Sequence, residues 1–292
     1  MTLFKKIIKG VSFRLQSVFL RFFTVYDYLR SNNNIYNEPS MCAFYQCYKK
    51  PKCVIATLAS FRKIYPMGTV HLFCDQGDDM SHIASYFNCN YEYLTNRTGN
   101  GTTLYFLSKE QLTSYVKRLL FAAQNSKEDF LMILEDDTKV FRKIRKLKFD
   151  WNSIKSNHHY SGGEVTSLLK TRNSSIPGYI RNMYFAGWGG VVLNRNFFVE
   201  HFSNEKELLA AIDLLSSYIQ GQWNGALPMD AILTALILYF GGTVGWYPGF
   251  SEVQYWRYKL RPFLGRIDVV HNDKSLYNAS LSEEESRIFL GN

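Results

Sequence analysis

Three consecutive carboxylates, Glu135, Asp136 and Asp137, directly follow the apolar run FLMIL at residues 130–134. The apolar run predicts a buried strand, so the carboxylates stand at the end of that strand. Neighbouring carboxylates repel one another, and a bound Mg²⁺ or Mn²⁺ relieves the repulsion. Such ions take oxygen ligands and complete their shell with phosphates and water. The segment therefore predicts a metal site, an acid–base site or the cap of a following helix.

The surrounding chain predicts alternating strands and helices, which would position these carboxylates. Strands are expected at 41–48, 69–75, 89–94 and 129–134, and helices at 50–65, 80–88 and 108–126. The last of these helices opens with Ser108 and Gln111, which have the spacing of a capping box. The order implies a mostly parallel sheet with helices on both faces, where ligands bind beyond the carboxyl ends of the strands. A second acidic segment, CDQGDD at 74–79, also follows a predicted strand.

The composition of the chain indicates which classes of ligand and partner to expect. The chain has 292 residues, 46% of them hydrophobic, and a formal net charge of +9, which favours anionic ligands. It lacks zinc-finger spacing, a basic region with heptads and an aromatic RNA-binding motif, so we expect no nucleic-acid partner. The five cysteines are irregularly spaced in the first third of the chain. We therefore expect buried free thiols in a reducing compartment.

The N-terminal residues 1–38 predict an amphipathic helical extension before a main domain at 39–292. Arg14, Gln16 and Arg21 interrupt its apolar stretch, which is too short to span a bilayer. The helix would pack on the domain or lie on a membrane surface with its basic side toward anionic lipid. We expect neither a signal peptide nor a transmembrane span, and hence a cytoplasmic, peripherally attached or soluble protein.

The strand that ends in Glu135, Asp136 and Asp137, after a series of strand–helix units, resembles the DXD motif of GT-A fold glycosyltransferases. This resemblance implies a single GT-A-like, Rossmann-like α/β domain that moves a sugar from a UDP-sugar to a hydroxyl of a glycan acceptor, with Mn²⁺ or Mg²⁺ bound. It implies Asp137 as a direct metal ligand, Glu135 at the metal or the ribose, and Asp136 at the ribose or the metal's water shell. Short members without an export signal resemble enzymes of bacteria and large DNA viruses.

The resemblance also implies donor contacts elsewhere in the chain. One lies in the loop after the second strand, which reads Cys-Asp-Gln-Gly where the family often has Asp-Asp-Gly-Ser. Others lie on the helix at 108–126 and in the segment YFAGWGG, where glycines permit close backbone approach. The implied donor-binding residues are Asp75, Lys117, Arg118, Trp188, Gly189, Gly190 and, near a phosphate, Lys274.

Two further positions match the family's catalytic and metal-binding groups. Asp230, in the first turn of a predicted apolar helix, would be the general base of an inverting transfer, or would only stabilise the helix N-terminus. His271, after the apolar run DVV, would complete the metal shell together with Glu135 and Asp137. If no carboxylate lies below the sugar, the enzyme retains the anomeric configuration, and Asp230 binds only the acceptor.

Other function classes stay open from the sequence. A nucleotidyltransferase or a phosphohydrolase also places carboxylates at strand ends. The sequence offers neither a glycine-rich phosphate loop with lysine near its start nor a set of His and Asp residues suited to two metals. A non-catalytic carbohydrate- or nucleotide-binding protein with a degenerate site is the alternative from outside the enzymes.

Overall fold

The structure is a computed structural model that describes residues 39–95, 105–106, 108–145, 154–156, 189–220, 227–242, 244–246, 249–252, 267–271 and 282–290. The predicted helix at 1–38 lies outside these residues, as do Trp188 and Lys274. Membrane contact by that helix and the cytoplasmic location stay predictions. Among the described helices, none is both long and apolar enough to cross a membrane.

The first half of the domain alternates strands with helices as the sequence predicted, except for one unexpected two-residue strand at Tyr105–Phe106. Its elements are β1 (Met41–Cys47), α2 (Pro51–Ile64), β2 (Val70–Asp75), α3 (Ser81–Tyr86), β3 (Asn90–Leu94), β4 (Tyr105–Phe106), α4 (Lys109–Gln124) and β5 (Phe130–Leu134). The capping box of α4 is confirmed, because the Gln111 N–H donates to Ser108 Oγ and the Ser108 N–H donates to the Gln111 side chain. The five cysteines are free, and four of them are buried.

The second half contributes shorter strands and a helical layer. Its elements are β6 (Lys139–Val140), β7 (Ile154–Ser156), β8 (Val192–Asn194), α6 (Arg195–Phe202), α7 (Glu205–Gln220), β9 (Leu227–Pro228), α8 (Met229–Tyr239), β10 (Val244–Trp246), β11 (Phe250–Glu252), β12 (Val269–His271) and α10 (Glu283–Leu290). Strands β10 and β11 are close in the chain but belong to different sheets.

The main sheet has the strand order β10-β7-β8-β5-β1-β2-β3. Strands β3, β2, β1 and β5 pair in parallel, whereas β8 is antiparallel to β5 and β7. A second sheet orders β11-β12-β6, and β4 pairs with β9. The expected mostly parallel α/β sheet is therefore confirmed. The carboxyl ends of β2, β1 and β5 meet at one edge.

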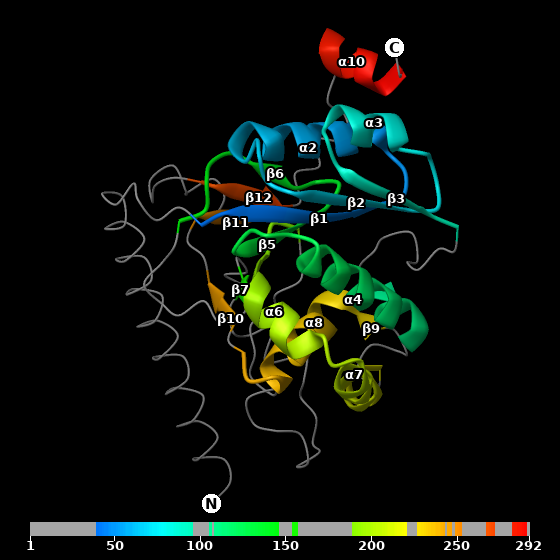
Figure 1. Cartoon of the computed structure of the whole chain (residues 1–292), viewed down its shortest axis with the longest axis vertical. Coiled ribbons are helices and arrows are strands. Elements are labelled where there is room, and N and C mark those ends of the chain that lie inside the picture. Colours follow the sequence, from blue (N-terminus) through cyan, green and yellow to red (C-terminus); the bar gives the residue numbers. More distant parts are fainter. Residues whose placement is uncertain are drawn as a thin grey trace, which may run out of the picture.

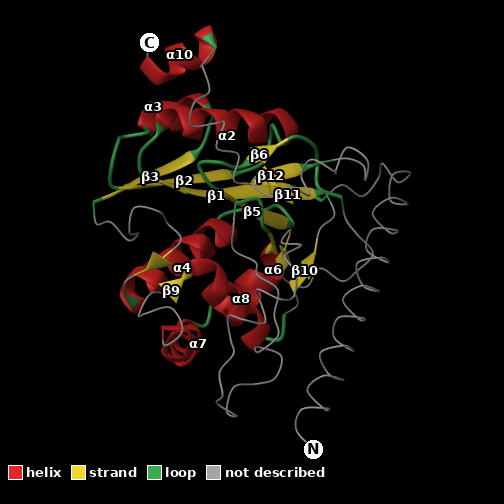
Figure 2. Cartoon of the chain, turned by 180° about the vertical axis from the view of Figure 1, so that it is seen from behind, coloured by secondary structure: helices red, strands yellow, loops and turns green. Residues whose placement is uncertain are grey.

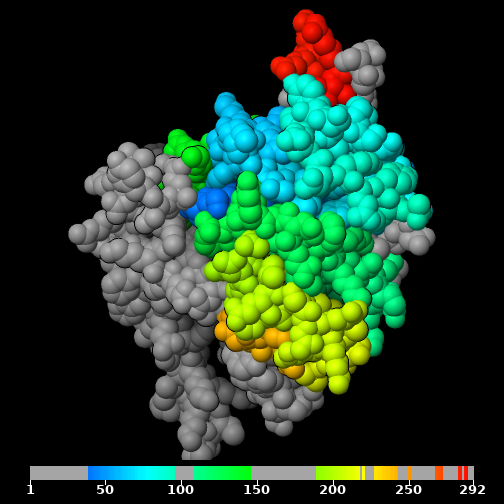
Figure 3. All heavy atoms as spheres, viewed as in Figure 1, coloured from blue at the N-terminus to red at the C-terminus, as the bar shows by residue number. Residues whose placement is uncertain are grey.

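Helices cover both faces of the main sheet, as expected. Figures 1 and 2 show α2, α3 and α10 on one face and α4, α6, α7 and α8 on the other. On the face of the molecule seen in the space-filling view, α4 and the helices that follow it lie below the first strands and helices (Figure 3). A separate cluster of buried apolar side chains lies between the sheet and the helices on each of its two faces. Every residue of α8 from Met229 to Ile237 is buried, which suits its almost wholly apolar sequence.

Candidate metal and donor site

Glu135, Asp137 and His271 form a cluster at the carboxyl end of β5. One ligand atom from each lies within 4.8 Å of the other two. His271 Nε2 is 3.1 Å from Glu135 Oε2 and 3.4 Å from Asp137 Oδ1. His271 and Asp137 are buried, and Glu135 is partly buried. The structure thus brings together the three residues that the sequence nominated as metal ligands.

The two strands around the cluster explain how these distant residues meet. The chain turns after Leu134, and Thr138 N donates to the carbonyl of Glu135 (3.0 Å), which closes the turn. Strand β6 follows at once and pairs antiparallel with β12, with Val140 opposite Val269. Because the pairing is antiparallel, His271 at the end of β12 is carried back toward the turn.

Two threonines fix the backbone of the turn. The Glu135 N–H donates to Thr138 Oγ1 (3.1 Å). From α2, the Thr57 hydroxyl lies 3.1 Å from the Thr138 carbonyl oxygen and 3.3 Å from that of Glu135, and it can donate to either. Both threonines are fully buried. Neither was singled out from the sequence, where a threonine within an apolar helix resembles ordinary core filling.

Gly189 packs directly against the cluster. A Cβ atom at this position would lie 2.0 Å from Thr138 Oγ1, 2.9 Å from His271 Cδ2 and 3.0 Å from Glu135 Cβ. The neighbouring Gly190 has φ +88°, and its N–H donates to the carbonyl of Ile133. Both glycines were expected near the donor sugar. Their observed environment is the metal-ligand cluster for Gly189 and the β5 backbone for Gly190.

Asp136 does not join the cluster. Its Oδ1 accepts a hydrogen bond from the Tyr45 hydroxyl (3.0 Å), and its Oδ2 lies 3.5 Å from Lys50 Nζ. Burial raises the pKa of Asp136 to about 6, although Lys50 acts in the opposite direction. The expected contact of Asp136 with a ribose stays a prediction.

Asp75 and Arg118 form a partly hidden ion pair beside the site. Arg118 Nη1 lies 3.5 Å from Asp75 Oδ1, and Asp75 is 1% exposed. Burial lowers the pKa of Arg118, and Asp75 opposes this shift. Tyr115, one helical turn before Arg118, is buried. Its pKa is raised mainly by burial and to a smaller degree by the negative charge of Glu135. The side of α4 that carries Tyr115 and Arg118 therefore faces Asp75 at the end of β2 and Phe44 on β1.

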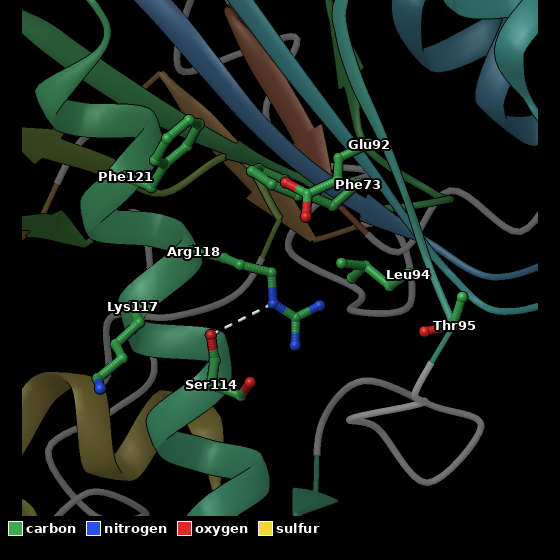
Figure 4. Close-up of a pocket in the computed structure, with 8 residues that line it drawn as sticks. All are labelled: Phe73, Glu92, Leu94, Thr95, Ser114, Lys117, Arg118 and Phe121. Carbon is green, nitrogen blue, oxygen red and sulfur yellow. Dashed lines mark hydrogen bonds between the residues drawn. The ribbon is translucent and has the colours of Figure 1, made fainter.

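A cavity of about 500 Å³ lies between α4 and the end of β3. The Arg118 guanidinium points into it, and Arg118 Nε donates to the carbonyl of Ser114 (Figure 4). Phe73 and Phe121 are part of its wall. Lys117 also borders the cavity, but its Nζ pairs with Glu205 on α7 at 2.5 Å. Of the two basic residues expected at the donor, Arg118 is thus the one directed into the cavity.

Gln46 is a further polar residue that the sequence did not single out. It is 6% exposed, and within the described part of the chain neither amide atom of its side chain has a hydrogen-bond partner. Side chains alternate along β1, so Gln46 lies on the same face as Phe44, whose ring packs on Tyr115 of α4. A buried amide without partners costs about 1–3 kcal/mol, which marks Gln46 as a group that a ligand could satisfy.

Asp230 lies in the first turn of α8, as predicted, and is buried. Its Oδ1 accepts from the Ala231 N–H (2.9 Å), and its carbonyl accepts from the Thr234 hydroxyl (2.6 Å). It is not a member of the cluster formed by Glu135, Asp137 and His271. These contacts stabilise the helix start, and the catalytic role expected for Asp230 stays a proposal.

No protein-family model matches this chain, and no curated protein is significantly similar to it. Solved structures are similar in fold. An active-site mutant of the galactosyltransferase LgtC has a TM-score of 0.50 at 12% identity, covering 85% of this chain and 99% of that one. The bifunctional glycosyltransferase WbbM has a TM-score of 0.50 at 10% identity, covering 89% and 53%. Mouse xyloside xylosyltransferase 1 has a TM-score of 0.46 at 12% identity, covering 83% and 99%.

Sequence identities this low leave only the fold as a shared property. LgtC and WbbM are matched over more than four fifths of this chain. The chain therefore has the fold of GT-A glycosyltransferases, as the resemblance of the strand-end carboxylates implied.

Proposed function

We propose that the protein is a metal-dependent glycosyltransferase that moves a sugar from a UDP-sugar to a hydroxyl of a glycan acceptor. One observation carries the proposal. Two carboxylates and an imidazole, from Glu135, Asp137 and His271, converge at the carboxyl end of a central strand in a fold of the GT-A type. In open α/β sheets this edge is where ligands bind.

The three side chains suit a divalent cation such as Mn²⁺. Carboxylate oxygens are ligands for hard cations, and an imidazole nitrogen is acceptable to Mn²⁺. Glu135 Oε1 is buried and, among the described residues, has no hydrogen-bond partner, so it is available as a ligand atom. When bound, the ion would offset the negative charge of the diphosphate leaving group.

The remaining donor contacts belong to the same proposal. Arg118, held by Asp75, would face the nucleotide sugar from α4, and the Gln46 amide would bind it from β1. Gly189 would keep the metal ligands and the donor close together. The roles expected for Lys117, Gly190, Trp188 and Lys274 also stay part of the proposal.

For the stereochemistry we propose inversion, with Asp230 as the base that accepts the proton of the acceptor hydroxyl. Its buried carboxylate in the first turn of α8 supports a fixed orientation. Retention of configuration, with Asp230 binding the acceptor, is the alternative within this fold.

Release of free nucleotide tests the function directly. The purified chain is incubated with individual UDP- and GDP-sugars and Mn²⁺, and nucleotide produced by slow hydrolysis is measured. We expect release from one UDP-sugar, its loss when EDTA removes the metal, and its loss in Asp137→Asn. Asp213→Asn is the matched control, because Asp213 is an exposed carboxylate on α7 paired with Lys109.

Two outcomes would contradict the proposal. Failure of the wild type to bind or hydrolyse any nucleotide sugar, with or without metal, argues for a non-catalytic protein or another ligand. Equal nucleotide release by Asp137→Asn and Asp213→Asn places the active centre elsewhere.

A further inference from the structure

We infer that Asp136 is a positioning residue: anchored by the Tyr45 hydroxyl, it sets the orientation in which its neighbours Glu135 and Asp137 present their carboxylates. The inference rests on the proposed metal site. It gives the middle residue of the acidic triplet a task different from the contact with ribose or metal-bound water that the sequence suggested.

The three side chains of the triplet point in two different directions. Glu135 and Asp137 turn toward His271, with carboxylate oxygens 3.1 Å and 3.4 Å from its Nε2. Asp136 turns toward β1 and the start of α2, where it contacts Tyr45 and Lys50. A carboxylate fixed on one side of a four-residue turn restricts the rotation of the turn, and so restricts where the residues on either side can point.

Tyr45 is the stronger of the two anchors. It lies within β1, is 0% exposed, and donates a hydrogen bond to Asp136 Oδ1 at 3.0 Å. The side chain of Lys50 is 52% exposed and its Nζ is 3.5 Å from Oδ2. Exposed ion pairs contribute little because water screens them. The anchor therefore depends on a rigid, buried hydroxyl in the central sheet.

The rest of the turn is already fixed at its ends. Thr57 Oγ1 lies within hydrogen-bond distance of the carbonyls of Glu135 and Thr138, and Thr138 Oγ1 accepts from the Glu135 N–H. At the middle of the turn, Asp136 is held by the hydrogen bond from Tyr45 and, more weakly, by Lys50. Partners that orient metal ligands in this way commonly change metal affinity by roughly 10–100-fold when they are removed.

Mn²⁺ affinity in the absence of donor measures this effect without relying on activity. Titration calorimetry, supported by the electron paramagnetic resonance of free Mn²⁺, is applied to the wild type, Tyr45→Phe, Asp136→Ala and Asp136→Asn. We expect Tyr45→Phe and Asp136→Ala to bind Mn²⁺ at least about 10-fold more weakly. Asp136→Asn should stay within a factor of about three of the wild type, because its amide oxygen still accepts from the Tyr45 hydroxyl.

Tyr65→Phe is the matched control. Its hydroxyl is also buried and hydrogen-bonded, but to the N–H of Ile144. The control should lose a similar amount of thermal stability and keep the Mn²⁺ affinity of the wild type. In the Asp136→Ala background, Tyr45→Phe should cause no further loss of affinity, since residues that act through one contact are not additive.

The outcomes separate this inference from the proposed function. Unchanged Mn²⁺ affinity in Tyr45→Phe, or an equal loss in Asp136→Asn and Asp136→Ala, would overturn the positioning role; the second result would make Asp136 a direct ligand. Mn²⁺ binding that follows the expected series, in a chain that hydrolyses no nucleotide sugar, would overturn the proposed function and leave the positioning role intact. A wild type that binds no Mn²⁺ would overturn both.

Discussion

His271 Nε2 lies 3.1 Å from Glu135 Oε2 although 136 positions separate the two residues in the chain. Asp137 Oδ1 completes the group at 3.4 Å from the same nitrogen. Two carboxylates that converge on one imidazole would be partly satisfied by a protonated histidine. The buried Glu135 Oε1, which has no hydrogen-bond partner among the described residues, is better explained by a cation.

Loss of His271 should therefore weaken metal binding. We expect His271→Ala to reduce Mn²⁺ affinity by more than the roughly 10–100-fold that loss of an indirect partner costs, with a parallel fall in nucleotide release. Calorimetry and the nucleotide-release assay measure the two effects. His82→Ala, an exposed histidine on α3, is the control and should match the wild type. Wild-type Mn²⁺ affinity in His271→Ala would remove this residue from the site.

Gly189→Ala should damage the site through sterics alone. Its new methyl group would lie 2.0 Å from Thr138 Oγ1 and 2.9 Å from His271 Cδ2, so the ligand cluster must shift. We expect a loss of about 1–3 kcal/mol in the free energy of unfolding, together with weaker Mn²⁺ binding.

The control for this change is Gly241→Ala. Gly241 has φ +81° and nothing within 4 Å of an added Cβ, so alanine there strains the backbone without touching the site. It should cost about 1–2 kcal/mol of stability and leave Mn²⁺ affinity unchanged. Equal metal affinity in both variants would show that Gly189 has no special relation to the cluster.

The Gln46→Leu variant should be more stable than the wild type but should have a higher KM for the nucleotide sugar. Removing a buried amide that has no partner in the described structure should raise the free energy of unfolding by about 1 kcal/mol. For a domain of this size that corresponds to an increase in Tm of roughly 2–4 °C. If the amide binds the donor, the KM for the nucleotide sugar should rise about 10-fold, the cost of one lost hydrogen bond.

Ser216→Ala provides the comparison. Ser216, on α7, is also fully buried, and its hydroxyl has no hydrogen-bond partner in the described residues. This variant should gain stability and keep the KM of the wild type. A Gln46→Leu protein with unchanged KM would show that the amide does not contact the donor.

The order of elements as far as β5, apart from the two-residue strand β4, could be predicted because each local pattern is strong. Buried strands such as Phe130–Leu134 are continuous apolar runs, and α4 carries its capping box in Ser108 and Gln111. The antiparallel pairing of β8 with β5 could not be predicted, since a three-residue strand has too little pattern to define its partner.

Within the candidate site, positions set by the local sequence could be predicted, whereas contacts that depend on the pairing of distant strands could not. The strand-end position of Glu135 and Asp137 follows from the sequence alone, whereas His271 reaches them through the pairing of β6 with β12, and only the family resemblance nominated it. Tyr45 could not be identified, because a tyrosine in a buried strand has the pattern of a core residue. Its hydrogen bond to Asp136 depends on the register of β1 beside β5.

Stability should fall in mild acid through His71. This residue is buried in β2, with Nε2 3.2 Å from Ser126 Oγ, and burial lowers its pKa below the ordinary 6.5. The unfolded chain therefore binds more protons between the lowered pKa and 6.5. The contribution of neutral His71 is complete above pH 6.5 and is lost as the pH falls through that window, by up to about 1.4 kcal/mol per pH unit.

Urea unfolding at pH values from 5 to 8 measures this dependence. Other groups titrate in the same range, Asp136 among them, so the informative quantity is the difference between the wild type and His71→Gln. We expect the free energy of unfolding of the wild type to decrease relative to that of the variant as the pH is lowered. A constant difference between the two proteins across the range would contradict the assignment to His71.

The kinetics of Asp230→Asn and the configuration of the product together distinguish inversion from retention. A general base contributes roughly 10²–10⁴-fold to the rate of a transfer. We therefore expect Asp230→Asn to lower kcat within that range, to change the KM for the donor little, and to keep Mn²⁺ affinity, because Asp230 is not part of the cluster of Glu135, Asp137 and His271. Proton nuclear magnetic resonance of the first product should show an anomeric configuration opposite to that of the donor.

Retained configuration, together with a rise in the KM for the acceptor and little change in kcat, would instead assign Asp230 to acceptor binding. The two results differ in both readouts because a base acts on the transition state, whereas an acceptor contact also stabilises the ground state.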